Sequence, residues 1–327
     1  MVIAIPVPVT PYRNLSCTWG GAAVQEAEKI AVIGLGSMGW GAAVSLLRAG
    51  FRVTGCDVRP DVLQRLEDAG GTPCGTASEA AKDAAAVFIY VVNSAQAEEV
   101  LLGQGGALET ADPGTVFMLC STMAPSATVS LADRLEAAGM LVIDAPVSGG
   151  HLKALSGEIT VMASGSDAAF AKAQTALDAV SAKVFRLGDK PGMGSQVKMI
   201  NQLLAGVHIA ATAEAMTLAA KTGIDLQTLY DVLRVSAGSS WMFENRGEHI
   251  IAGDYAPRSA VDIFVKDLGI VTAEAARNGA TTPLASIALD LFKEASAAGL
   301  GREDDAAVAI ILAKKSGVSL PGMEGQA

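Results

Sequence analysis

A glycine-rich turn that directly follows a short apolar segment constrains the fold of this chain more than any other feature. Residues 34–39 read GLGSMG, follow the β-prone segment 29–33 and open a helical pattern. In such a pattern Gly34 permits a tight turn, Gly36 lets the backbone approach a pyrophosphate, and Gly39 allows the helix to pack closely on the strand. Backbone N–H groups and the helix dipole then favour an anion at this position. The residues predicted to bind a dinucleotide here are Gly34, Leu35, Gly36, Ser37, Met38 and Gly39.

An acidic residue follows the next predicted strand, about 20 residues after the glycine turn, where dinucleotide-binding folds carry the residue that binds the ribose. Asp57 follows the predicted strand 52–56 and can accept a hydrogen bond from the ribose 2′-hydroxyl. The same carboxylate would repel a 2′-phosphate, so Asp57 predicts NAD as the cofactor. Arg59 lies two residues on and leaves NADP open as an alternative.

Strand and helix patterns alternate through the first half of the chain, which predicts right-handed crossovers and a mainly parallel sheet. After Pro191-Gly192 only helical patterns remain. The predicted fold is therefore an α/β Rossmann-type doubly wound sheet plus an all-α C-terminal domain, joined by a long interdomain helix. The predicted strands are 29–33, 52–56, 86–92, 115–119, 140–144, 158–163 and 182–186, and the predicted helices are 38–49, 60–69, 78–82, 95–102, 126–138, 194–221, 225–236, 240–252, 260–278, 283–298 and 303–315. The predicted divisions are an N-terminal extension (1–28), an NAD-binding domain (29–192), the interdomain helix (193–222), a helical substrate and assembly domain (223–317) and a flexible tail (318–327).

Composition excludes several classes of partner. The net charge of −10 makes nucleic acid or an anionic membrane surface an unsuitable partner. The longest uninterrupted apolar run, 84–92, is too short to span a bilayer, so no membrane segment is expected. The four cysteines form no CxxC pair and the three histidines are scattered, which predicts reduced thiols, a cytoplasmic location and no metal.

A lysine and an asparagine share one face of the long helical pattern after residue 194. Lys198 and Asn201 lie three residues apart, among apolar neighbours such as Val197 and Met199. Burial of the lysine would lower its pKa toward the range useful for proton transfer near neutral pH. Lys198 is therefore the predicted proton donor or acceptor, and the alternative is a lysine on a solvated helix face.

Further candidates follow predicted strands at the edge of the sheet where ligands bind in such folds. The loop 144–150 ends in Gly149-Gly150, whose N–H groups could bind a carboxylate, although an ordinary Pro/Gly loop explains it equally well. Ser121 and Thr122 could bring hydroxyl groups to the same edge or could cap the next helix. Lys266, beside Asp267, taken alone would be a surface ion pair.

In sequence order these motifs resemble those of the β-hydroxyacid dehydrogenases. The resemblance covers residues 29 to about 312 and rests on four stretches, 34–39, 144–150, 194–201 and 266–268. It implies that Lys198 is the catalytic acid/base, that Asn201 holds the substrate, and that Ser121, Gly149 and Gly150 bind the substrate carboxylate. It also implies that Val91, Val92, Thr122 and Lys266 reach the cofactor, and that the chain assembles into a homodimer or homotetramer. Many relatives carry two asparagines where this chain has Asn201-Gln202.

Within that family, residues 203–208, 240–246 and 255–269 resemble the members that act on L-threonate. The expected reaction is therefore NAD-dependent oxidation of a small hydroxy acid, with L-threonate converted at C2 to 2-dehydro-L-erythronate. The alternatives are 3-hydroxyisobutyrate or tartronate semialdehyde as substrate, and more distantly a non-catalytic scaffold that binds the cofactor. Because both the scaffold proteins and the related imine reductases generally lack the lysine, Lys198 favours a dehydrogenase.

Overall fold

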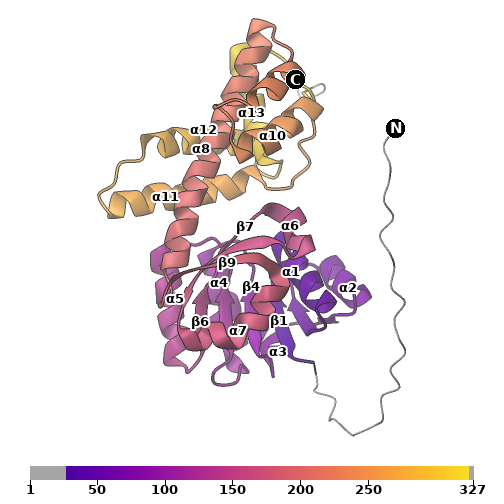
Figure 1. Ribbon diagram of the computed structural model, residues 1–327, viewed down its shortest axis with the longest axis vertical. Helices are drawn as coiled ribbons and strands as arrows, with labels where there is room; N and C mark the ends of the chain where they lie inside the picture. The colour runs from indigo at the N-terminus through magenta and orange to yellow at the C-terminus, as the bar shows by residue number, and fades with distance from the viewer. Residues whose placement is uncertain (1–26, 324–327) are drawn as a thin grey trace, which may run out of the picture.

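The computed structural model describes residues 27–323, which form a sheet domain and a helical domain joined by one long helix, α8 (Figure 1). The structure confirms the predicted fold class, a Rossmann-type sheet followed by a mostly helical domain. Most of the predicted N-terminal extension (residues 1–26) and the end of the predicted tail (residues 324–327) lie outside the described residues.

The sheet runs in the order β3-β2-β1-β4-β5-β6-β8-β7, with β9 paired to β8. The first six strands of this order are parallel, as predicted, whereas β8 is antiparallel to both β6 and β7 and parallel to β9. The strands are β1 (Lys29–Ile33), β2 (Arg52–Cys56), β3 (Thr72–Pro73), β4 (Ala86–Ile89), β5 (Val116–Leu119), β6 (Leu141–Asp144), β7 (Val147–Ser148), β8 (Ile159–Gly165) and β9 (Ser181–Gly188).

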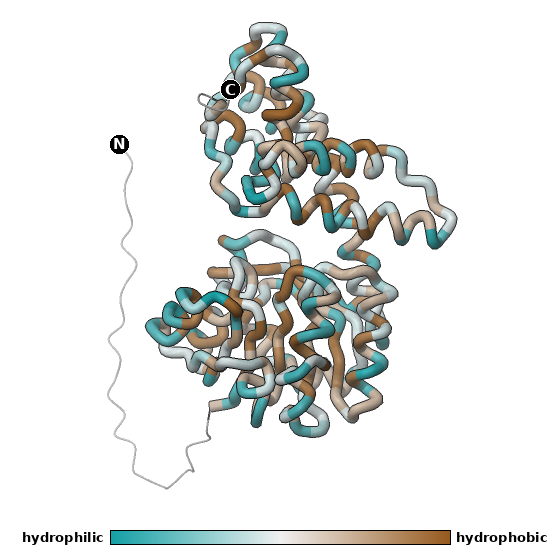
Figure 2. Tube along the Cα trace, turned by 180° about the vertical axis from the view of Figure 1, so that it is seen from behind, coloured by the Kyte–Doolittle hydropathy of each residue, from teal (hydrophilic) through white to brown (hydrophobic). Residues whose placement is uncertain are grey.

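Helices cover both faces of the sheet, so the central strands are apolar throughout (Figure 2). Alternate residues of one strand enter opposite cores: Phe88 packs with α1, α2 and α7, while Ile89 packs with α3, α4 and α5. These helices are α1 (Ser37–Arg48), α2 (Pro60–Asp68), α3 (Ala77–Ala81), α4 (Ser94–Leu102), α5 (Pro125–Ala137), α6 (Gly150–Ser156) and α7 (Asp167–Val180), with a 3₁₀ turn at Ala107–Glu109.

Four elements were not predicted from the sequence: α6, α7 and the short strands β3 and β7. The signal for α7 was present, because Ser166 caps its N-terminus and Phe170, Ala173 and Leu177 recur at helical spacing and are buried. The reading of 144–150 as a single loop left no place for β7 and α6, which begin inside it.

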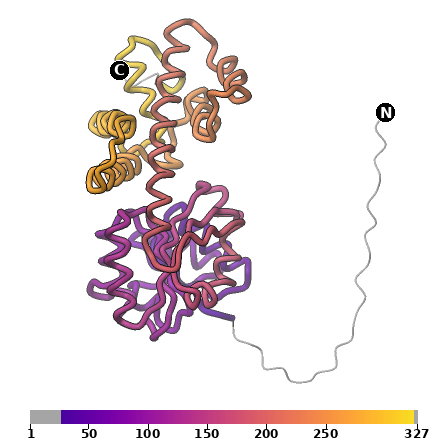
Figure 3. Tube along the Cα trace, turned by 60° about the vertical axis from the view of Figure 1, so that its left-hand side comes forward, coloured from indigo at the N-terminus to yellow at the C-terminus, as the bar shows by residue number. Residues whose placement is uncertain are grey.

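The helical domain forms around the C-terminal two-thirds of α8 (Met193–Thr222), which rises out of the sheet domain (Figure 3). Gly223 ends α8 in a left-handed conformation that favours glycine. Three predicted ends in this domain differ: the helix expected over 225–236 ends at Leu233, the one expected over 283–298 ends at Ala295, and the last one begins at Val308 after a 3₁₀ turn. The helices are α9 (Leu226–Leu233), α10 (Trp241–Ala252), α11 (Val261–Arg277), α12 (Pro283–Ala295) with a π turn at Ser296–Leu300, a 3₁₀ turn at Asp305–Ala307, and α13 (Val308–Ser316).

Within residues 27–323, α8 is the one helix long and apolar enough, by length and composition, to cross a membrane. No long uninterrupted apolar run marks α8 in the sequence, because residues such as Lys198 and His208 interrupt it. Its apolar character has a local explanation: Ile209, Ala213 and Met216 belong to the core of the helical domain.

Candidate active site between the two domains

The glycine turn has the geometry that a bound pyrophosphate requires. Gly34 has a φ of +86°, and a Cβ there would lie 2.5 Å from the carbonyl oxygen of Tyr90. A Cβ at Gly39 would lie 1.9 Å from the carbonyl oxygen of Gly34, so the helix touches the turn. At Gly36, by contrast, a Cβ would meet nothing within 4 Å, and no side chain caps the start of α1. The residues therefore fit a dinucleotide, with open space at Gly36 and the uncapped N-terminus of α1 where the phosphates would bind.

The carboxylate of Asp57 lies beside this turn, at the end of β2. Its Oδ2 accepts a hydrogen bond from the backbone N–H of Leu35 at 2.7 Å, and Arg59 contacts both carboxylate oxygens at 3.0 and 3.1 Å. Burial by itself raises the pKa of Asp57, but these hydrogen bonds outweigh it and hold the pKa below its usual value. Asp57 is therefore ionised, and Arg59 occupies the oxygens that a ribose hydroxyl would use.

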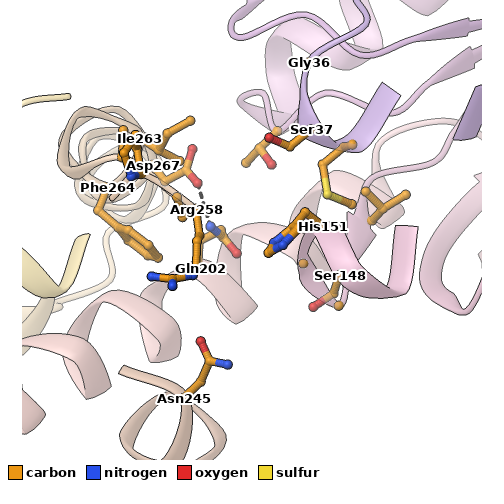
Figure 4. A pocket seen from close by; sticks show the side chains of 18 of the residues that line it. Gly36, Ser37, Ser148, His151, Gln202, Asn245, Arg258, Ile263, Phe264 and Asp267 are labelled. Atoms are coloured by element: carbon orange, nitrogen blue, oxygen red, sulfur yellow. Dashed lines mark hydrogen bonds between the residues drawn. The ribbon is translucent and has the colours of Figure 1, made fainter. Parts of the chain in front are cut away.

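A cavity of about 1100 Å³ separates the glycine turn from the helical domain. Its walls come from the ends of β4 and β5, the β7–α6 loop, α8, α10 and α11 (Figure 4). Most of the predicted site residues line it, whereas Gly34, Leu35, Gly39 and Asp57 do not and instead shape the turn beside it. The predicted residues in its lining are Gly36, Ser37, Met38, Val91, Val92, Ser121, Thr122, Gly149, Gly150, Lys198, Asn201 and Lys266.

Lys198 projects from α8 into this cavity and is only 7% exposed. Desolvation lowers its pKa from 10.5 to about 8, a shift that Asp267 opposes and the charge of Lys266 reinforces. An amine with a pKa near 8 exists in both protonation states close to neutral pH, as a general acid or base requires.

The charged groups that act on this amine belong to a polar network between α8 and α11. Asp267 is 2% exposed and pairs with Lys266 at 2.7 Å, and Lys266 also donates to the carbonyl oxygen of Thr122 at 2.9 Å. The Gln202 amide donates to Asp267 at 2.6 Å, and the Asn201 amide donates to Gln202 at 3.0 Å. The glutamine that follows Asn201 is therefore a link between α8 and α11.

The sheet side of the cavity supplies hydroxyl and backbone groups. Ser121 donates its hydroxyl to the carbonyl oxygen of Val91 at 2.7 Å, which leaves the oxygen able to accept. Gly149 and Gly150 have φ values of +133° and +75° and are the N-cap and the first residue of α6. Glycine is favoured at both positions, and both residues line the cavity.

Sequence reasoning missed the role of Asp144, which is fully buried at the end of β6. Its carboxylate accepts hydrogen bonds from the N–H groups of Gly192 and Ser195 at 2.9 and 2.7 Å, and from the Ser195 hydroxyl at 2.7 Å. A Cβ at Gly194 would lie 2.4 Å from the carbonyl oxygen of Met162, so α8 starts directly against the sheet. Asp144 therefore fixes the start of the helix that carries Lys198.

Sequence reasoning also did not assign the polar residues that the helical domain and α6 bring to the cavity. These include His151, Asn245, Arg246, His249 and Arg258. His151 lies far along the chain from the other four, which fall within residues 245–258, and only the fold places both segments around one space. Among the described residues, no group of three or more His, Cys, Asp or Glu is placed to hold a metal ion.

Comparison with known proteins assigns both halves of the chain. Residues 29–188 match the NAD-binding domain of 6-phosphogluconate dehydrogenase, and residues 192–312 match the NAD-binding domain of NADP-dependent 3-hydroxyisobutyrate dehydrogenase. L-threonate dehydrogenase of Cupriavidus necator is 52% identical over 90% of this chain and 99% of its own length. The chain belongs to the β-hydroxyacid dehydrogenase family.

Two further proteins named 3-hydroxyisobutyrate dehydrogenase are similar to this chain over most of their length. The 3-hydroxyisobutyrate dehydrogenase of Pseudomonas aeruginosa is 33% identical over 80% of this chain and 90% of its own length. A crystal structure named 3-hydroxyisobutyrate dehydrogenase, from Salmonella typhimurium, is 50% identical and superposes with a TM-score of 0.83 over 87% of this chain and 99% of its own. As a member of this family the chain is an oxidoreductase that uses a nicotinamide dinucleotide.

Proposed function

We propose that this β-hydroxyacid dehydrogenase oxidises L-threonate at C2 to 2-dehydro-L-erythronate, with NAD in preference to NADP. The observation that carries the proposal is the buried Lys198, whose pKa of about 8 suits proton transfer, in a cavity that also contains the glycine turn. Supporting it, L-threonate dehydrogenases of Cupriavidus necator and Escherichia coli K12 are 52% and 51% identical to this chain.

In this mechanism neutral Lys198 takes the proton of the C2 hydroxyl, and Asn201 orients that hydroxyl. The Ser121 hydroxyl, turned from the carbonyl oxygen of Val91 to donate to the substrate, and the N–H groups of Gly149 and Gly150 bind the substrate carboxylate. A bound nicotinamide supplies the hydride acceptor for the carbinol hydrogen. Lys198 is protonated at the end of the oxidation and returns the proton in the reverse direction.

For the cofactor, Gly34 to Gly39 bind the pyrophosphate, and Asp57 binds the adenosine ribose once Arg59 moves aside. Val91, Val92, Thr122 and Lys266, which line the cavity, would contact the cofactor. In this assignment residues 29–192 bind the cofactor, 193–222 carry the acid/base, and 223–317 complete the substrate pocket.

The test is a steady-state assay of a hydroxy-acid panel with NAD and with NADP. We expect the highest kcat/KM with L-threonate and NAD, and Lys198→Ala should lower kcat by about 10³-fold or more while NADH still binds. Lys190→Ala, which changes an exposed lysine outside the cavity, is the matched control and should keep native activity. A Lys198→Ala enzyme that retained most of its kcat would refute this mechanism.

The second candidate substrate is 3-hydroxyisobutyrate, because the Salmonella typhimurium structure that is 50% identical carries that name. The two names differ at nearly the same identity, so the substrate panel decides between them. A higher kcat/KM with 3-hydroxyisobutyrate or tartronate semialdehyde than with L-threonate would replace our assignment.

We also propose that the chain forms a homodimer or homotetramer in the cytoplasm. The helical region exposes large apolar side chains, among them Leu204, Leu218 and Leu284, which are 51%, 63% and 65% exposed. Light scattering after gel filtration should give a mass of two or four chains, and a monomer at micromolar concentration would contradict this. Cell fractionation tests the compartment.

A further inference from the structure

The helical domain presents a polar wall to the cavity, opposite the wall that contains the glycine turn. Figure 4 shows Asn245 and Arg258 on the helical side, while Ser37, Ser148 and His151 lie on the sheet side. Neither Asn245 nor Arg258 has a part in the proton transfer described above. We therefore ask which polar group of a ligand these two side chains could bind.

The amide of Asn245 is held in one orientation by a buried ion pair. Arg246 donates a hydrogen bond from Nη1 to Oδ1 of Asn245, and its Nη2 contacts Oδ2 of Asp305 at 2.8 Å. Arg246 is 7% exposed and Asp305 is fully buried. Because the carbonyl oxygen of Asn245 is already used, its NH₂ group is the end left for a ligand. Among the described residues, that nitrogen has no hydrogen-bond partner.

A second buried carboxylate fixes the loop that carries Arg258. Asp304, fully buried, accepts from the backbone N–H of Arg258 at 3.3 Å and contacts Nδ1 of His249 at 2.9 Å. The Arg258 guanidinium pairs with Asp254 through Nη2 at 2.5 Å, which leaves its other N–H groups as donors. Although the carboxylates of Glu248 and Asp254 also line this wall, Asn245 and Arg258 give it hydrogen-bond donors suited to oxygen atoms.

The tetrahedral geometry of C2 directs the rest of the substrate to this wall. In the proposed reaction, Ser121, Gly149 and Gly150 hold the carboxylate, Lys198 and Asn201 hold the hydroxyl, and the C2 hydrogen faces the domain that binds the cofactor. The fourth substituent of C2, the carbon tail, must then point away from the sheet domain. In that direction lie α10 and the loop before α11, which supply Asn245 and Arg258.

We propose that Asn245, together with Arg258, is the specificity-determining site that binds the tail hydroxyls of a polyhydroxy acid. This inference rests on the proposed function and deepens it: the enzyme selects acids whose tail carries oxygen atoms over acids of equal length with an apolar tail. Arg246 and Asp305 are positioning residues that turn the Asn245 amide so that it donates.

Two variants of Asn245 test the site. Asn245→Asp keeps the size of the side chain and an oxygen for Arg246 but removes the N–H donor, and Asn245→Ala removes the whole amide. Glu244→Gln, an exposed change on the same helix outside the cavity, is the control. Each variant is assayed for kcat/KM with L-threonate and for the inhibition constant of 2-hydroxybutanoate of matching C2 configuration. That analogue has the same number of carbons and no tail hydroxyl.

Both Asn245 variants should lower kcat/KM for L-threonate by about tenfold or more, because a tail hydroxyl of the bound substrate is then left without its hydrogen-bond donor. Both should leave the inhibition constant of 2-hydroxybutanoate within about twofold of the native value, and their Tm and NADH affinity should match those of Glu244→Gln. If both ligands bind more weakly by the same factor, Asn245 has a structural role only. If Asn245→Asp has native kinetics, the Asn245 N–H group does not bind the substrate. Either result overturns the proposal. A native enzyme inactive with L-threonate would refute the proposed function instead.

Discussion

The acid beside the catalytic lysine should control the pH dependence of the reaction. Oxidation needs neutral Lys198, so kcat/KM should rise with pH and level off above the pKa of about 8. Asp267 raises that pKa and Lys266 lowers it. Removing the acid in Asp267→Asn should therefore move the profile to lower pH, and removing the cation in Lys266→Met should move it to higher pH.

The size of the effect follows from the two charges. At pH 7 a lysine with a pKa near 8 is neutral in roughly one molecule in ten, against roughly one in three thousand at the ordinary value of 10.5. A charge a few ångströms away in a partly dried site shifts a pKa by about one unit or more. Asp267→Asn should thus move the midpoint from about 8 to about 7, and Lys266→Met should move it to about 9.

The measurement is kcat/KM from pH 6 to 10 for the native enzyme and both variants, since this ratio reports the free enzyme. Asp290→Asn on α12, an ion-paired acid that is 79% exposed, is the matched control and should keep the native midpoint. NADH binding and thermal unfolding show whether each variant is folded, because Asp267 is buried. Midpoints that move together, or an upward shift in Asp267→Asn, would refute the electrostatic explanation.

Three further perturbations test the site and its support. Lys198→Met should abolish turnover yet stabilise the fold by up to about 3 kcal/mol below pH 8, where the native enzyme buries a charged lysine. That gain disappears between about pH 8 and 10.5, because the folded lysine is then neutral while the unfolded one still holds its proton; urea unfolding at pH 7 and 10 checks it. Asp57→Ala should lower kcat/KM for NAD about tenfold, and Arg59→Met should reduce activity with NADP, so paired assays with both cofactors that gave unchanged ratios would contradict their roles. Asp144→Ala leaves the N–H of Ser195 and its neighbours unpaired and should lower the free energy of unfolding by about 3 kcal/mol; a denaturation midpoint equal to the native one would show that α8 does not depend on it.

The fold could be predicted from local patterns because a Rossmann-type domain repeats them. The turn at Gly34–Gly39 and the buried strands around Phe88 and Phe117 carry their signal within a few residues. The strand β8 was predicted over 158–163, but its antiparallel direction could not be, because that direction depends on pairing with both β6 and β7 rather than on its own composition.

The site was only partly predictable for a similar reason. Lys198 stands out because an isolated cation on an apolar helix has few structural explanations. Gln202 and Asp267 do not, because their contact joins residues 65 positions apart and nothing in either segment indicates the other. Asp144 was the harder case, since an acid after a strand suggests ligand binding, whereas the structure uses it to bind the start of α8.

The sheet domain positions the acid/base, and the helical domain positions the residues proposed to bind the substrate tail. This division would let relatives differ in substrate while they keep the same proton transfer. Asp144 ties the first turn of α8 to the sheet, so the position of Lys198 relative to the glycine turn is set by the sheet domain. Asn245 and Arg258 are positioned by Asp304 and Asp305, which belong entirely to the helical domain. Substitutions around α10 can therefore change which tail is bound without moving the amine that transfers the proton. Changes at Asn245 should accordingly alter the ratio between substrates, while changes at Asp144 should lower the rate with all of them.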